Sequence, residues 1–228
     1  MSFEGHELLS DLSLRTFLDR DKSIFRHYQN LFLKRYGAEV VGNVIEIGGE
    51  KAYRHERFFP RATSFHCTNI ARDHDEFLDA TNMSLADGAV DAFVCISVLE
   101  HVFDFQAVVR EVRRTLKPGG TLLLVVPFAF PHHDTVDYWR LSSDAYPKLL
   151  EGFEINAFVH LGGLFSTIAD NLKRPAGKLS KRYLFHKLLG LGTVAFFRRF
   201  EQLDGLPLGY GVYCTRAMTR RGSSTSSL

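Results

Sequence analysis

The side chains of this sequence that could do chemistry follow short apolar runs. Glu46 lies in the run at residues 44–47, which ends in the pair Gly48-Gly49. Glycines let a backbone approach a ligand closely. Further polar groups follow the later runs: Asn69, Asp79, Ser97, Glu100, His101, His132 and His133. The unperturbed pKa of histidine is near neutrality, so each imidazole could remove a proton from a hydroxyl group.

Six apolar runs predict the strands that position these side chains. The runs cover residues 40–47, 62–70, 92–98, 121–127, 155–159 and 209–215. They are continuous rather than alternating in polarity, which is typical of parallel strands buried on both faces. Apolar residues with helical spacing at 24–32 and 105–116 predict helices. We expect an α/β fold in which the residues after the strands meet at one sheet edge, where such folds bind ligands.

Length and composition indicate a single globular domain. The chain has 228 residues, of which 45% are hydrophobic and 24% charged. We predict one domain over residues 1–218, with a helical N-terminal segment at 1–38 and a helical insertion at 170–205 before the last strand. The serine-rich residues 219–228 are predicted to be a disordered tail.

Charge and cysteine content restrict the partners and the location. The formal charge is only +2, so we expect no nucleic-acid partner. Three cysteines without CxxC spacing indicate reduced thiols, and the first ten residues do not resemble a signal peptide, which together predict a cytoplasmic protein. The basic and apolar segment 178–199 has two interpretations: a helical lid or homodimer contact, or an amphipathic helix at a membrane surface.

Several short motifs occur in a fixed order along the chain. They are VIEIGG at 44–49, AYR at 52–54, DAT at 79–81, VLEHV at 98–102, LKPGG at 116–120, and His132 with DYWR at 137–140. Together they resemble the class I S-adenosylmethionine-dependent methyltransferases, and most closely the type 11 subgroup. The resemblance implies a Rossmann-like, doubly wound, mostly parallel sheet of seven strands with helices on both faces. The GxGxxG fingerprint of nicotinamide enzymes is absent after residue 47, which disfavours that class.

The same resemblance implies a binding site for S-adenosyl-L-methionine. Its expected residues are Glu46, Gly48, Gly49, Asn69, Asp79, Ala80, Thr81, Ser97 and Val98. Glu46 would accept a hydrogen bond from the ammonium group of the ligand, Asn69 would meet the ribose, and Asp79 would accept from the adenine amino group. Glu50 and Asn69 depart from the family pattern, so a catalytically degenerate scaffold protein is an alternative.

The expected reaction is O-methylation of a small-molecule or saccharide-like acceptor. The candidate catalytic residues are His132, His133 and His101. The candidate substrate-binding residues are Tyr138, Trp139 and Arg140. An arginine beside two aromatic rings could hold an anionic or sugar-like group, or the three residues could serve packing and an ion pair.

Two alternatives concern a metal and a membrane. No metal is expected in the main interpretation. Some methyltransferases hold a divalent cation with an ExxEH segment, of which Glu100 and His101 are present, and His132 or His133 could complete the set. Ser97 replaces the first glutamate. The other alternative is a peripheral membrane methyltransferase that acts on a lipid-linked substrate.

Overall fold

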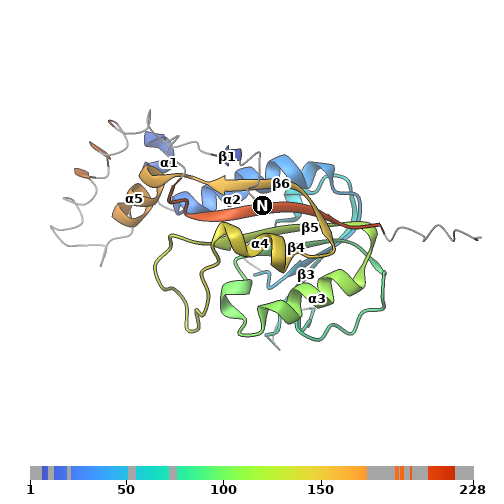
Figure 1. Cartoon of the computed structure of the whole chain (residues 1–228). Coiled ribbons are helices and arrows are strands. Elements are labelled where there is room, and N and C mark those ends of the chain that lie inside the picture. The colour runs from blue at the N-terminus through green and yellow to red at the C-terminus, as the bar shows by residue number, and fades with distance from the viewer. Residues whose placement is uncertain are drawn as a thin grey trace, which may run out of the picture.

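A single twisted sheet forms the centre of the molecule (Figure 1). The computed structural model describes residues 7–9, 13–19, 22–50, 55–71, 76–173, 188–189, 191–192, 196 and 205–218. The strands are β1 (Glu7–Leu9), β2 (Gly42–Ile47), β3 (Ala62–Thr68), β4 (Val90–Ile96), β5 (Leu116–Pro127), β6 (Phe153–Leu161) and β7 (Gly209–Arg216). Their order in the sheet is β1-β6-β7-β5-β4-β2-β3. All neighbouring strands are parallel except β7, which is antiparallel to both β5 and β6.

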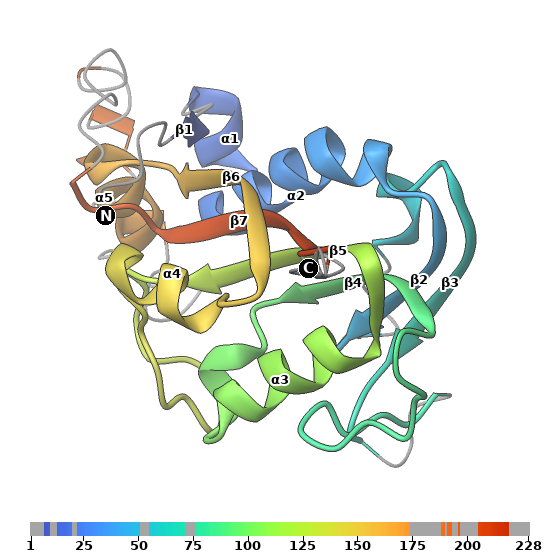
Figure 2. The same cartoon turned by 45° about the vertical axis from the view of Figure 1, so that its right-hand side comes forward.

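Helices cover both faces of this sheet (Figure 2). The α-helices are α1 (Leu14–Leu18), α2 (Ile24–Tyr36), α3 (Phe105–Thr115), α4 (Tyr146–Leu149) and α5 (Leu164–Lys173). Single 3-10 turns lie at Gly37–Glu39, Glu56–Phe58, Leu99–His101 and Ser143–Ala145. Side chains of a strand alternate between two faces, and so they supply two separate cores. In β5, Leu122 and Leu124 pack in the core under α3, whereas Leu123 and Val125 pack in the core under α2.

Local sequence explains where the two main helices begin. The Ser23 side chain caps α2 by accepting a hydrogen bond from the backbone N–H of Arg26 at 3.0 Å. The Asp104 side chain caps α3 in the same way through the N–H of Ala107, also at 3.0 Å. Such caps satisfy backbone donors that have no partner inside the helix. Both helices start close to the carboxyl edge of the sheet, beside the residues of the expected site: Ser23 and Phe103, next to the two starts, line the cavity there.

The predicted fold class is confirmed, and the N-terminal segment differs in detail. Six strands form the Rossmann-like sheet, and the seventh is the short strand β1, which pairs with β6. Residues 1–38 were expected to be helical, and they contain this strand beside α1 and α2. The tail at 219–228 and most of the segment 174–204 lie outside the described residues, so the predicted insertion, homodimer contact and membrane helix stay predictions. Among the helices that are described, none is long and apolar enough to cross a membrane.

Candidate active site

A cavity of about 700 Å³ lies at the carboxyl ends of β2, β3 and β4. The chain runs from β2 outward to β3 and then returns to place β4 on the other side of β2, which makes this edge a switch point of the topology. All nine residues expected around a cofactor line this cavity: Glu46, Gly48, Gly49, Asn69, Asp79, Ala80, Thr81, Ser97 and Val98. Loops that are far apart in sequence are thus brought to one hollow.

Glu46 presents a buried carboxylate to the cavity. Its side chain is 2% exposed, and Oε1 accepts a hydrogen bond of 2.5 Å from Nδ1 of His55. Oε2 is buried and has no hydrogen-bond partner among the residues that the structure describes. Such an orphaned oxygen is costly unless a donor reaches it, so it suits a cationic N–H group of a ligand.

The turn after β2 depends on two glycines and on Asn69. Gly48 has a φ of +68°, and a Cβ there would lie 2.6 Å from Cγ2 of Val98. The side-chain amide of Asn69 donates a hydrogen bond of 2.9 Å to the carbonyl oxygen of Gly49. Asn69 therefore holds the glycine turn against the end of β3. Glu50 is exposed and also lines the cavity.

Asp79 is held in place by a local turn. Its Oδ1 accepts hydrogen bonds from the backbone N–H of Thr81 at 2.9 Å and from the Thr81 hydroxyl at 2.7 Å. Its Oδ2 makes no hydrogen bond within the described part of the chain. The carboxylate is thus oriented through one oxygen and keeps the other available to a donor.

A contact between Ser97 and helix α2 was not predicted. Ser97 has a φ of +53°, which is uncommon for a residue with a side chain and stores strain at this point after β4. Nε2 of Gln29, a buried residue of α2, donates a hydrogen bond of 2.7 Å to Oγ of Ser97. Helix α2 also brings Ser23, Phe25 and Arg26 to the cavity. The available signal was a glutamine within the otherwise apolar stripe of this helix.

The structure brings two of the three candidate histidines together. The rings of His101 and His133 meet edge to face, with centroids 4.9 Å apart, and both line the cavity. Burial lowers the pKa of His133. Of these neighbours in sequence, His133 lines the cavity, whereas His132 does not and is exposed to solvent.

The predicted substrate residues divide in the same way. Tyr138 lines the cavity. Trp139 instead packs against the rings of Phe103 and Phe105. Arg140 donates two hydrogen bonds to the Asp137 carboxylate, at 2.5 and 2.6 Å, and this guanidinium holds the pKa of Asp137 well below its usual range. For Trp139 and Arg140, the alternative of packing and an ion pair matches the structure.

Glu100 is the most deeply buried carboxyl group beside the two histidines. Its side chain is fully buried, and neither carboxyl oxygen has a hydrogen-bond partner among the described residues. Burial raises the pKa of this carboxyl to about 8. One ligand atom each from Glu100, His101 and His133 can be chosen so that all lie within 4.8 Å of one another. Of the two histidines considered for a metal set, His133 rather than His132 lies within this distance.

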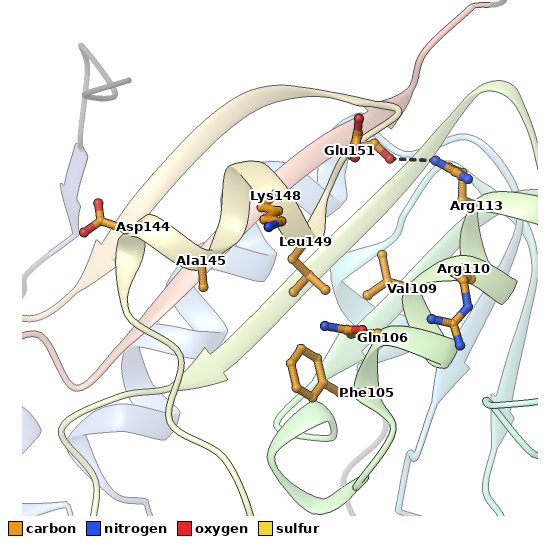
Figure 3. A pocket seen from close by; sticks show the side chains of 10 residues that line it. All are labelled: Phe105, Gln106, Val109, Arg110, Arg113, Asp144, Ala145, Lys148, Leu149 and Glu151. Carbon is orange, nitrogen blue, oxygen red and sulfur yellow. Dashed lines mark hydrogen bonds between the residues drawn. The ribbon is translucent and has the colours of Figure 1, made fainter.

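A second hollow of about 460 Å³ lies between α3 and α4, away from these residues (Figure 3). Arg110, Arg113 and Lys148 line it together with apolar side chains, such as Phe105 and Leu149, and with other polar ones. Arg113 donates a hydrogen bond of 2.9 Å to the carbonyl oxygen of Glu151, and Arg110 forms an exposed pair with Asp104. None of the residues expected to bind cofactor or substrate lines this hollow.

Comparison with known proteins agrees with this geometry. Residues 31–124 match a family model described as a methyltransferase domain. Among solved structures, a geranyl diphosphate C-methyltransferase from Streptomyces coelicolor A3(2) superposes with a TM-score of 0.59 at 13% identity, covering 94% of each chain. The [4+2]-cyclase SpnF superposes with a TM-score of 0.56 at 16% identity, covering 94% of this chain and 88% of its own. No curated protein sequence shows a significant match.

The fold and the matched domain together define the class of protein. Structures of such low identity establish the fold, and the family model identifies the domain within it as a methyltransferase domain. Residues 31–124 therefore form a methyltransferase domain, and the chain has the class I methyltransferase fold.

Proposed function

We propose that this methyltransferase methylates a hydroxyl oxygen of a small-molecule or saccharide-like acceptor within the cavity at the strand ends. The observation that carries the proposal is that the expected cofactor residues and two histidines line one hollow. Its volume is within the range of roughly 300–1,000 Å³ that is typical of small-molecule sites. S-adenosyl-L-methionine, when bound, would supply a methyl carbon that is activated by its sulfonium group. The bond between sulfur and this carbon would break as the new C–O bond forms.

The cofactor is proposed to lie between Glu46 and Asp79. The free Oε2 of Glu46 would accept from its ammonium group, and the free Oδ2 of Asp79 would accept from its adenine amino group. The backbone at Gly48 and Gly49 would pass beneath it, because no side chain stands there. These groups fit the ligand in both charge and hydrogen-bonding capacity.

The acceptor is proposed to occupy the part of the cavity formed by α2 and the aromatic loops. Phe103, Phe130 and Tyr138 supply aromatic surface there, while Arg26 and Gln29 supply polar groups. Aromatic faces pack on the C–H groups of sugars, and polar side chains select hydroxyl groups. This mixture favours a hydroxylated acceptor over a purely apolar one.

Removal of the hydroxyl proton is the task that this account assigns to the histidine pair. Burial keeps His133 neutral near pH 7, because it disfavours the charged imidazolium. A neutral imidazole has one nitrogen lone pair, which can accept a proton or bind a cation.

The test is methyl transfer from S-adenosyl-L-methionine with a labelled methyl group to a panel of hydroxylated compounds, including saccharides, and to matched amines. We expect label on oxygen of at least one hydroxylated compound, with release of S-adenosylhomocysteine. Label found on the amines alone would contradict O-methylation while leaving the cofactor assignment intact.

A further inference from the structure

We propose that Glu100, His101 and His133 bind a divalent transition-metal ion, such as Zn²⁺, in the wall of the cavity. Nε2 of His101 lies 3.6 Å from Oε1 of Glu100, and Nε2 of His133 lies 3.9 Å from the same oxygen. These spacings are too long for hydrogen bonds, and an ion about 2 Å from each ligand atom could sit between the three after a small inward shift.

Both imidazoles are oriented through the nitrogen that does not face Glu100. Nδ1 of His101 lies 2.5 Å from the carbonyl oxygen of Val136, an acceptor without a proton, so this nitrogen must be the donor. Nδ1 of His133 lies 3.2 Å from Oδ2 of Asp137, whose carboxylate is also bound by Arg140. The neutral rings therefore carry their lone pairs on the Nε2 atoms, which both approach Glu100. Such outer hydrogen bonds are typical of metal-binding histidines.

Glu100 supplies the independent observation that points to a cation. Its carboxyl group is fully buried, and both oxygens lack hydrogen-bond partners among the residues described. Its backbone is firmly placed, because its carbonyl oxygen accepts a hydrogen bond of 2.7 Å from the N–H of Tyr138. A buried carboxyl group without hydrogen-bond partners is destabilising, and a bound cation would stabilise its ionised form.

The donor set selects the kind of ion. Two imidazole nitrogens and one carboxylate oxygen suit Zn²⁺ and related transition metals, whereas Mg²⁺ and Ca²⁺ prefer oxygen ligands throughout. Three protein ligands leave coordination positions open, and His101 and His133 both line the cavity. With an ion bound, the two imidazoles would be its ligands and not the bases, and the ion would lower the pKa of a hydroxyl group that reached it. This role in methyl transfer rests on the proposed function, whereas metal binding does not.

The test is a calorimetric titration of the full chain, freed of metal by EDTA and dialysis, with Zn²⁺. We expect saturable binding of one ion per chain and little competition by Mg²⁺. His133→Ala should weaken binding by tenfold or more, whereas His132→Ala, which changes the exposed neighbour, should leave it unaltered. Glu100→Gln keeps the shape of the buried side chain and should weaken binding as strongly as His133→Ala.

Two results would overturn the metal site: absence of saturable Zn²⁺ binding to the wild type, or equal affinities of His133→Ala and His132→Ala. Because His133 is partly exposed, its substitution tests the site even if Glu100→Gln does not fold. S-adenosylhomocysteine binding by the same proteins separates this proposal from the proposed function. A wild-type protein that binds S-adenosylhomocysteine but shows no saturable Zn²⁺ binding would refute the metal site alone.

Discussion

The cavity at the strand ends and the hollow between α3 and α4 differ in the polar groups that surround them. The cavity at the strand ends is lined by Glu46, which has an orphaned buried oxygen, and by the strained Ser97, and the buried Glu100 lies beside two of its lining histidines. The hollow between α3 and α4 is lined by apolar side chains and by exposed polar ones, of which Arg110 and Arg113 already have partners. Unsatisfied burial and strain lower stability, so they persist where a ligand compensates for them. The difference favours the strand-end cavity as the proposed site.

The largest effect is expected at Glu46. Glu46→Gln keeps the shape of the side chain and removes the negative charge that the ligand's ammonium group would meet. We expect S-adenosylhomocysteine to bind roughly 10- to 100-fold more weakly, the range of a lost charge-assisted hydrogen bond. Calorimetry measures this, with Glu151→Gln in the other hollow as the matched control. Equal affinities of the two variants would remove the distinction between the hollows.

The ion pair between Arg140 and Asp137, whose carboxylate also contacts His133, should contribute measurably to the stability of the fold. Arg140→Ala leaves the buried Asp137 carboxylate without its guanidinium, and we expect a loss of about 2 kcal/mol in the free energy of unfolding at pH 7. The control Arg110→Ala breaks only an exposed pair and should have no measurable effect. Urea unfolding of both variants provides the comparison.

The same pair predicts a pH dependence. The pKa of folded Asp137 is lowered by Arg140, so its contribution is fully present above the unfolded pKa of about 3.9. It is lost as the pH falls through the folded pKa. The stability difference between wild type and Arg140→Ala should thus shrink as the pH falls below about 4. A difference that grew on acidification would contradict this assignment.

A smaller effect is expected at Asp79. Asp79→Ala removes the free oxygen assigned to the adenine amino group, and we expect about a tenfold loss of S-adenosylhomocysteine affinity. Asp144→Ala, an exposed carboxylate of the other hollow, is the matched control. If Asp79→Ala binds as tightly as the control does, Asp79 is not part of the cofactor site.

The smallest effect should come from the cations of the second hollow. Lys148→Ala and Arg113→Ala are expected to leave S-adenosylhomocysteine affinity unchanged within error, because neither residue lines the strand-end cavity. A clear loss of affinity in either variant would mean that the two hollows are coupled.

The sheet and the placement of the cofactor residues were accessible from the sequence. Continuous apolar runs predicted the strands, and Glu46 and Asp79 follow from motifs whose order the topology imposes on one edge. Gln29 and His55 were missed, because they belong to a helix and a 3-10 turn that reach the cavity only through tertiary packing.

The choice among the histidines shows why the remainder of the site was not predictable. His132 and His133 are adjacent in a loop without periodicity, so the sequence does not determine which one faces inward. The structure decides through Asp137, whose carboxylate accepts hydrogen bonds from both the backbone N–H and Nδ1 of His133. That contact depends on the conformation of the whole loop.

The central claim is that S-adenosyl-L-methionine occupies the cavity at the carboxyl ends of β2, β3 and β4. Its most direct test is a crystal structure of the protein with S-adenosylhomocysteine. We predict ligand density with its amino-acid end at Oε2 of Glu46 and its adenine at Oδ2 of Asp79. Density in the hollow between α3 and α4, or a bound ligand that touches neither carboxylate, would contradict the account.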